Sequence, residues 1–209
     1  NAPVLSGSTS STMGEIGGTG NAIISVGAYT SKNSYPAFNG GAGQIDFPGT
    51  QGAIASFSSK GPTADGRTKP DITAPGNVVM SSVNRFDNSY TGSSAYVVSG
   101  VTDGTNNWWF AGMSGTSMAA PVTTGILALW LEAAPWLTQA QAKALAKNNA
   151  WTDSHTGSIG VNGSNTWGWG KIDAHEGMLA LLAAVSVDEQ PIVGSTVVFP
   201  NPSTGLVNL

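Results

Sequence analysis

The chain has 209 residues, only 10% of them charged, and a formal net charge of −4 at neutral pH. This length suits one domain with a sizeable hydrophobic core, or one domain followed by a tail. The acidic balance excludes the basic surface of a nucleic-acid-binding protein. Cysteine is absent, which excludes disulfides and thiol chemistry. No apolar run is long enough to predict a membrane span.

The first part of the chain is predicted to contain four strands. Residues 22–29 are apolar along most of their length, as expected for a strand that is buried on both faces. Shorter strands are expected at residues 53–57, 71–74 and 78–83, separated by glycine and proline turns.

Residues 80–110 are rich in aromatic side chains and are interrupted by glycines. We expect an extra hairpin or loop here, serving either as an aromatic substrate-binding rim or as a surface excursion that packs on itself. Residues 103–106 (Asp-Gly-Thr-Asn) offer oxygen ligands for calcium but lack the acid spacing of a dedicated calcium loop. A plain turn is therefore favoured at these four residues.

Three helices are predicted at residues 117–132, 139–147 and 174–184. The first is apolar on all sides, which indicates a central, buried helix. The second and third each begin with the residue spacing of a capping box. The two capping pairs are Thr138 with Gln141 and Asp173 with Glu176.

Residues 113–121 read Met-Ser-Gly-Thr-Ser-Met-Ala-Ala-Pro. This run resembles the segment around the nucleophilic serine of the subtilisin-like serine proteases (subtilases), with Ser117 at the nucleophile position. Gly115 allows the backbone to come close to a bound substrate. Ser117 is expected at the start of a helix, where unpaired amides and the helix dipole favour negative charge on a reacting oxygen. Thr116 is expected to support that site; the alternative is an ordinary helix cap after a turn.

Other segments resemble the same family in the same order, namely residues 22–29, 55–62, 69–76 and 168–174. The resemblance implies an α/β, three-layer subtilisin-like fold with a mainly parallel sheet. It also implies a catalytic triad in the chain order Asp, His, Ser. The only two histidines, His155 and His175, both follow Ser117, and neither matches the position of the family's base.

We therefore expect residues 1–184 to be the C-terminal part of a subtilase catalytic domain. The Asp and His of the triad are expected in a complementary N-terminal half, and the sheet is expected to have an open face and edge where that half belongs. Asn1 lies at a distance from the 22–29 strand comparable to that of the family's oxyanion-binding asparagine. An ordinary terminal asparagine is nevertheless favoured at this position.

The composition changes after residue 184. Residues 185–192 are predicted to be a polar linker, and residues 193–209 to be the start of a β-sandwich-like tail. The Val-Val-Phe-Pro-Asn-Pro-Ser-Thr-Gly run of this tail resembles the opening of the C-terminal sorting domain of type IX secretion. That resemblance implies export to the surface or medium of a Gram-negative bacterium, and the alternative is a generic β-sandwich start.

The family resemblance implies a serine endopeptidase acting on proteins or peptides through Ser117, with this chain alone nearly inactive. No cofactor is certain, although the resemblance makes structural calcium possible. Two other classes of function stay open. One is a non-catalytic scaffold derived from a subtilase, and the other is a glycan-binding module, suggested by seven tryptophans and a surface rich in Ser, Thr and Asn.

Overall fold

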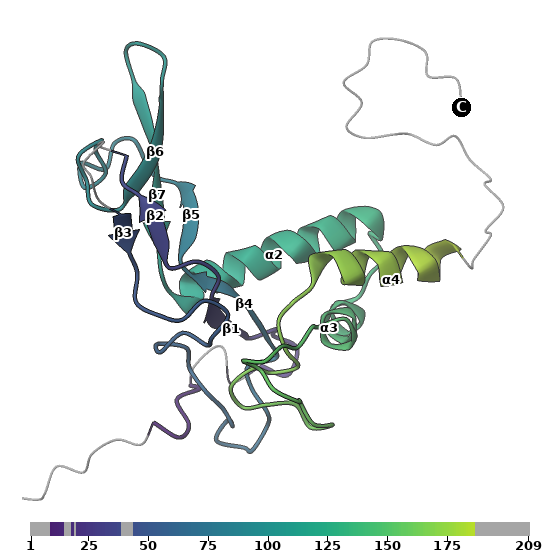
Figure 1. Ribbon diagram of the computed structural model, residues 1–209. Helices are drawn as coiled ribbons and strands as arrows, with labels where there is room; N and C mark the ends of the chain where they lie inside the picture. The colour runs from purple at the N-terminus through teal and green to yellow at the C-terminus, as the bar shows by residue number, and fades with distance from the viewer. Residues whose placement is uncertain (1–8, 15–17, 19, 39–43, 187–209) are drawn as a thin grey trace, which may run out of the picture.

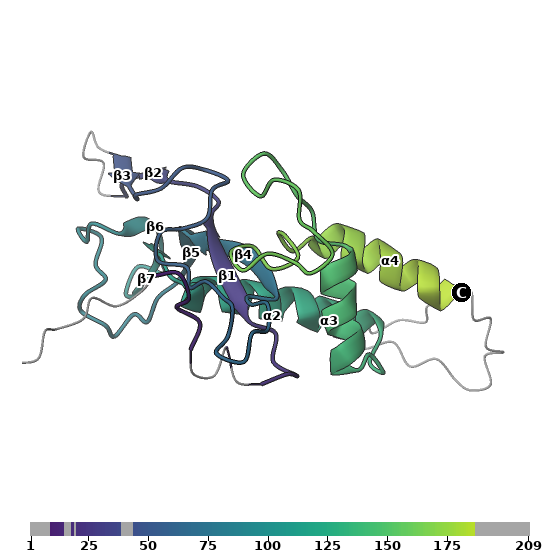
Figure 2. The ribbon, with the colours of Figure 1, turned by 90° about the horizontal axis from the view of Figure 1, so that it is seen from below.

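The computed structural model describes residues 9–14, 18, 20–38 and 44–186. At its centre β1 (Val26–Thr30) and β4 (Ile72–Asn77) pair in parallel. Figure 2 shows the two strands side by side, with α2 (Thr116–Ala133) behind them.

Small residues line the contact between this sheet and α2. Ala28, Ala74 and Ala119 are fully buried and belong to one apolar cluster, so the helix lies close to the strands. Near the other end of α2, the fully buried Trp130 lies against Gly177 of α4 (Ala174–Ser186), where a Cβ would overlap its indole ring. Its Nε1 donates a hydrogen bond to the carbonyl oxygen of Ala174 (3.1 Å), which satisfies the polar atom of a buried indole.

A second sheet projects from the body of the molecule (Figure 1). It is antiparallel, in the order β5-β7-β6, and its strands are β5 (Val79–Ser82), β6 (Val97–Thr102) and β7 (Asn107–Met113). Strands β6 and β7 form the extra hairpin predicted within residues 80–110, and that prediction is confirmed. A third pair, β2 (Ser34–Pro36) with β3 (Gln44–Asp46), is also antiparallel. The only parallel pairing among the described strands is thus β1 with β4.

The three predicted helices are confirmed as α2, α3 (Gln139–Asn148) and α4. The capping box at the start of α3 is present, because the Thr138 side chain accepts from the Gln141 amide and the Gln141 side chain accepts from the Thr138 amide. The Asp173 carboxylate caps α4, because its Oδ1 accepts from the amides of His175 (2.9 Å) and Glu176 (3.0 Å) in the first turn. Helix α4 continues to Ser186, two residues into the predicted linker.

Two predicted strands differ from the structure. Residues 53–57 form turns with one isolated bridge, from Ile54 to Tyr29, and not a strand. The backbone of this segment is bonded to β1 instead: the Ala55 amide donates to the Ala28 carbonyl oxygen (2.9 Å), and the Thr30 amide donates to the Ala53 carbonyl oxygen (2.9 Å). The edge of β1 is therefore covered at Ala28 and Thr30.

The strand predicted at residues 22–29 begins later, at Val26. The residue before it, Ser25, donates both its amide (2.8 Å) and its hydroxyl (3.1 Å) to the Asp71 carboxylate. Its carbonyl oxygen accepts from the Asp71 amide (2.8 Å). These bonds replace regular strand pairing at the start of the segment.

The prediction that residues 117–132 form a helix buried on all sides was wrong for the described chain. Leu129 and Leu131 of α2 are 54% and 41% exposed. Two leucines of α4, Leu179 and Leu182, are also about half exposed. The described residues thus cover one side of these apolar helices and leave another side free for packing.

A buried ion cluster ties the start of β4 to α3. The Asp71 carboxylate contacts Lys69 Nζ (2.6 Å) and Lys143 Nζ (2.7 Å), and the side chains of Lys69 and Asp71 are 3% and 9% exposed. Burial alone would raise the pKa of Asp71, but hydrogen bonds from Lys143, Lys69 and Ser25 outweigh it and lower that pKa below its usual value. The carboxylate is therefore held in its charged form.

Lys171 is a second buried cation and joins three distant segments. Its Nζ donates to the carbonyl oxygen of Gly52 (2.7 Å) and to Asp153 Oδ2 (2.6 Å). The same ammonium lies 4.8 Å from the ring centre of Trp151, within the range of a cation–π contact. The Lys171 backbone also bridges to Thr73 and to Trp151, which closes the edge of β4.

Some sequence predictions concern residues that the structure does not describe. Asn1 and the predicted sorting-domain start lie outside the described residues, as does the linker after Ser186. In the part of the chain that is described, none of the helices has both the length and the apolar character of a membrane-spanning segment.

Candidate active site

Ser117 is the second residue of α2 and its side chain is exposed at the end of the helix. The residue before the helix, Gly115, has φ +155° and ψ 158°, a conformation that residues with a side chain rarely adopt. The amides of Met118 and Ala119 donate to the Gly115 carbonyl oxygen (3.0 and 3.3 Å). Within the described residues the amides of Thr116 and Ser117 have no acceptor. Two free donors therefore lie at the start of α2.

The electrostatics of this helix end favour an anion. The first turn of α2 contains no acidic residue that would neutralise the positive end of the dipole. The oxygen of a carbonyl under attack by Ser117 Oγ gains negative charge, and amides aimed at such an oxygen stabilise it. The arrangement is thus suited to acyl transfer at a carbonyl carbon.

Strand β4 fixes the position of the turn before the helix. The Gly115 amide donates to the Gly76 carbonyl oxygen (2.8 Å). A side chain at Gly76 would bring its Cβ within 2.5 Å of Ala28 Cβ and 3.0 Å of Ala119 Cβ. Only glycine therefore allows the strand and the helix start to approach so closely.

The side chain of Asn77, which is only 2% exposed, is hydrogen-bonded to the turn before α2. Its Nδ2 donates to Thr30 Oγ1 (3.0 Å) and to the Pro48 carbonyl oxygen (2.6 Å), while its Oδ1 accepts from Ser114 Oγ (2.6 Å). Sequence reasoning missed this residue. Its partners are 29 to 47 residues away, so its role depends on tertiary contacts that no local pattern shows.

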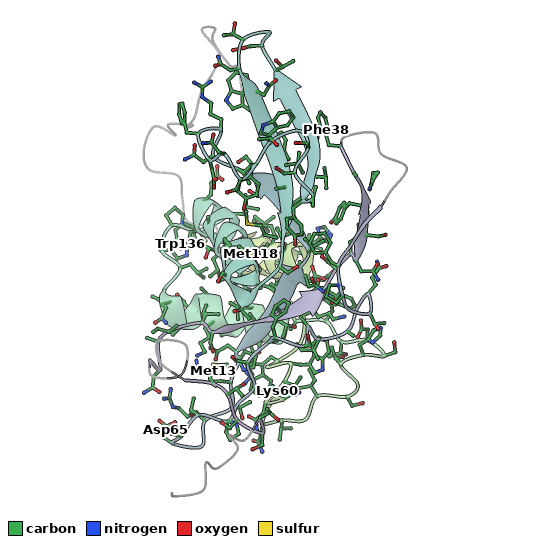
Figure 3. The ribbon with its side chains drawn as sticks, turned by 90° about the vertical axis from the view of Figure 1, so that its left-hand side faces the viewer. Met13, Phe38, Lys60, Asp65, Met118 and Trp136 are labelled. Atoms are coloured by element: carbon green, nitrogen blue, oxygen red, sulfur yellow. The ribbon has the colours of Figure 1, made fainter. Side chains whose placement is uncertain are left out.

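The structure places Gly115, Thr116 and Ser117 together at the helix start, as the motif predicted. Among the described residues the Thr116 hydroxyl forms no hydrogen bond, so the geometry adds no specific contact for its expected supporting role. Beside the site, an apolar cavity of about 410 Å³ lies between β5 and α2, and its walls include Met113, Met118 and Pro121. Figure 3 shows Met118 where the hairpin sheet meets α2.

The two histidines lie elsewhere, in exposed positions. His155 is in the 151–166 loop, with its ring beside Gly52 and its amide donating to Asp153 Oδ1 (2.9 Å). His175 is in the first turn of α4, where its amide donates to the Asp173 cap. Within the described part of the chain, neither imidazole is hydrogen-bonded to Ser117.

The four residues considered for calcium form a turn. The Asp103 carboxylate accepts from the amides of Thr105 (2.9 Å) and Asn106 (2.7 Å) and from Asn106 Nδ2 (3.2 Å). The Asn106 amide, followed by that of Thr105, lowers the pKa of Asp103. The Asp103 carboxylate is thus engaged by the amides of its own turn.

Comparison with known proteins gives consistent results. The sequence profile of the subtilase family matches residues 5–170. The chain is 35% identical to serine protease AprX of Bacillus subtilis over 150 residues. That alignment covers 71% of this chain and 29% of the relative. The chain is also 30% identical to uncharacterized protein aq_aa18 of Aquifex aeolicus over 140 residues. That alignment covers 66% of this chain and 54% of the relative.

The fold is also similar to that of a solved protease. The CspB protease of Clostridium perfringens aligns with a TM-score of 0.50 at 24% identity, over 80% of this chain and 28% of that protein. The chain therefore spans about half or less of the length of these three proteins. The α/β, subtilisin-like fold class expected from the motifs is confirmed, and the chain belongs to the subtilase family of serine proteases.

Proposed function

We propose that this chain supplies the nucleophile of a serine endopeptidase, and that the nucleophile is Ser117. The observation that carries the proposal is the position of Ser117: an exposed hydroxyl at the positive end of α2, beside two amides without acceptors in the described chain. Membership of a family whose relatives include serine protease AprX supports peptide-bond hydrolysis as the reaction. Proteins or peptides are the proposed substrates.

In the proposed reaction Ser117 Oγ attacks the carbonyl carbon of the scissile bond. A histidine removes the hydroxyl proton and later delivers it to the leaving amine, and an aspartate orients that histidine. The Ser117 amide donates to the oxyanion as the tetrahedral intermediate forms. Thr116 and Gly115 contribute the backbone of the same turn.

We propose that the histidine and aspartate come from a preceding, complementary half of the catalytic domain. The exposed positions of His155 and His175, away from Ser117, support a base from another segment. The exposed leucines of α2 and α4, Leu129 and Leu182 among them, offer apolar surface on which that half can pack.

A fluorophosphonate probe tests the assignment, because it reacts with a serine that a neighbouring base has activated. We expect mass spectrometry of the labelled, active enzyme to find the probe on Ser117. Ser114, three residues earlier, serves as an internal control and should stay unlabelled, because its hydroxyl is bonded to Asn77 Oδ1 (2.6 Å). The separate 209-residue chain should label far more slowly than the same chain with its complementary half. Label on Ser114, or equal labelling of the separate chain, would contradict the proposal.

We also propose that the protein is exported. The support is the sequence of residues 193–209, which resembles the start of a type IX sorting domain, and the similarity of the chain to an extracellular serine protease of Serratia marcescens (31% identical over 106 residues, 50% of this chain and 10% of the relative). Deletion of residues 187–209 is expected to leave peptide hydrolysis by purified enzyme unchanged and to abolish delivery outside the cell, as measured by activity in the medium. Loss of hydrolysis in the purified deletion variant would show that the tail belongs to the catalytic domain.

A further inference from the structure

A second cavity, distinct from the region around Ser117, lies on the projecting hairpin sheet. It has a volume of about 320 Å³. One wall is formed by residues 85–91, and the other by the β6–β7 turn and the first residues of β7. This volume is near the lower end of the range for small-molecule sites, about 300–1,000 Å³. Three of its lining residues are aromatic: Phe86, Tyr90 and Trp109.

Trp109 is held as a fixed aromatic surface. It is opposite Gly100 in the β6–β7 register, and a Cβ at Gly100 would overlap its indole ring. A Cβ at Gly92 would lie 3.0 Å from the same ring. Phe38 contacts the indole edge-on, with ring centres 5.2 Å apart, and Figure 3 shows Phe38 beside the hairpin. Contacts with Gly92, Gly100 and Phe38 therefore set the orientation of the Trp109 ring, which also lines the cavity.

The opposite wall is preformed by local turns. The Asp87 amide donates to the Asn84 carbonyl oxygen (3.1 Å), and the Tyr90 amide donates to the Asp87 carbonyl oxygen (3.1 Å). The Asn84 side chain also accepts from the Phe86 amide (3.0 Å). The Val83 amide donates to the Trp109 carbonyl oxygen (3.0 Å), which joins this wall to β7. A ligand would thus meet a wall whose backbone is already ordered.

The polar groups of the cavity are mostly uncharged. Within the described residues the side-chain amides of Asn88 and Asn107 form no hydrogen bond, and both line the cavity. Each amide offers a donor and an acceptor. The two charged residues of the lining, Arg85 and Asp87, have opposite signs, so the cavity does not select an ion by net charge.

We propose that this cavity binds a pyranose ring of a neutral carbohydrate. A pyranose presents a face of C–H groups, which packs on an aromatic ring, and a rim of hydroxyls, each of which can donate and accept hydrogen bonds. The indole of Trp109 matches the first feature, and the amides of Asn88 and Asn107 match the second. An extended peptide would instead pair with a strand edge and would have no need of a cavity lined by aromatic rings and side-chain amides.

The position of the cavity gives the ligand two possible sources. Trp109 is four residues from Met113 along β7, or about 14 Å at a strand rise of about 3.4 Å per residue, and Ser117 lies beyond that end. A glycan on a protein substrate could therefore be bound beside Trp109 while a peptide bond of the same substrate lies near Ser117. A polysaccharide of a cell surface or matrix offers the same ring chemistry.

Isothermal titration of the 209-residue chain with maltotetraose, chitotetraose and mannotetraose tests the proposal. We expect at least one of the three to bind, and Trp109→Ala and Asn107→Ala each to weaken that binding at least tenfold. Trp109→Phe, which keeps an aromatic surface, should retain more affinity than Trp109→Ala. Trp136→Ala is the control at a tryptophan outside this cavity, because Trp136 is exposed and lies away from the hairpin, as Figure 3 shows. Ser117→Ala should bind the sugar as well as the unaltered chain, so this test is independent of the proposed protease chemistry.

Circular dichroism and the melting temperature of each variant, compared with those of the unaltered chain, show whether the variant is folded. If none of the three sugars binds at millimolar concentration, or if Trp109→Ala and Asn107→Ala bind as the unaltered chain does, the proposal is overturned. Displacement of the sugar by a neutral tetrapeptide of similar affinity would also overturn it, in favour of a peptide site. The two sources are distinguished by binding to a mannose-bearing glycoprotein, to its deglycosylated form and to insoluble polysaccharide.

Discussion

Replacement of Ser117 by alanine is expected to reduce kcat for peptide hydrolysis by the active enzyme about 10³- to 10⁶-fold and to leave KM nearly unchanged. The hydroxyl oxygen is the atom that forms the acyl bond in the proposed reaction, and alanine offers no substitute for it. The backbone amides at the start of α2 remain, so substrate binding and weak residual catalysis should persist. Steady-state hydrolysis of a chromogenic peptide measures both constants.

The control for this substitution is Ser158→Ala, a change at an exposed serine in the loop that also contains His155. It should leave kcat and KM as they are. The melting temperature of Ser117→Ala should also stay close to that of the unaltered enzyme, because the side chain is exposed. A Ser117→Ala enzyme that keeps more than about a tenth of kcat would exclude Ser117 as the nucleophile.

Replacement of Asp71 by asparagine is expected to lower the free energy of unfolding by about 3–5 kcal/mol and the melting temperature by roughly 6–20 °C. The Asp71 carboxylate is the shared partner of Lys69 and Lys143, at 2.6 and 2.7 Å, and it also accepts two hydrogen bonds from Ser25. Asparagine would leave the ammonium of Lys69, whose side chain is 3% exposed, without a counter-charge in the interior. Denaturant and thermal unfolding measure the loss.

Asp65→Asn is the matched control, because Asp65 pairs with Arg67 at a similar distance (2.8 Å) but its side chain is 60% exposed. Its melting temperature should be close to that of the unaltered protein. An equal loss in both variants would show that burial of the Asp71 cluster does not determine the effect.

The stabilisation by Asp71 should also depend on pH. Since the folded protein lowers the pKa of Asp71, the contribution is fully present above the ordinary carboxyl pKa of about 4 and is lost as pH falls through the lowered value. The difference in stability between the unaltered protein and Asp71→Asn should therefore shrink in acid. Unfolding measured at neutral pH and near pH 3 tests the direction.

Local patterns in the sequence were sufficient to predict the helices. Helix α2 follows directly from the Gly-Thr-Ser run and a continuous apolar segment, and α3 follows from the Thr138–Gln141 capping box. These signals involve residues within about one helical turn of each other, so a short stretch of sequence is enough to recognise them. The same locality explains why Gly115 and Ser117 could be placed at a helix start without knowledge of the tertiary structure.

The errors came from contacts between distant segments. Residues 53–57 have an apolar composition that suits a strand, but their amides and carbonyls bond to Ala28 and Thr30, and turns separate these bonds. The burial of α2 depends on which elements are present to cover it, which its own sequence does not specify. Asn77 was missed for a related reason, since its hydrogen bonds reach three separate segments.

The bridge between Thr73 and Lys171 sets an order of events during biosynthesis. The Thr73 hydroxyl donates to the carbonyl oxygen of Gly170, next to Lys171, across 97 residues of chain. A ribosome that adds about 5–20 residues per second needs roughly 5–20 seconds to span that separation. Ser117 is synthesised within this interval, before the residues that bridge to Thr73 exist. Strand β4 is thus completed at this edge only after Ser117 has been made, so helix α2 is synthesised before the sheet on which it packs is finished.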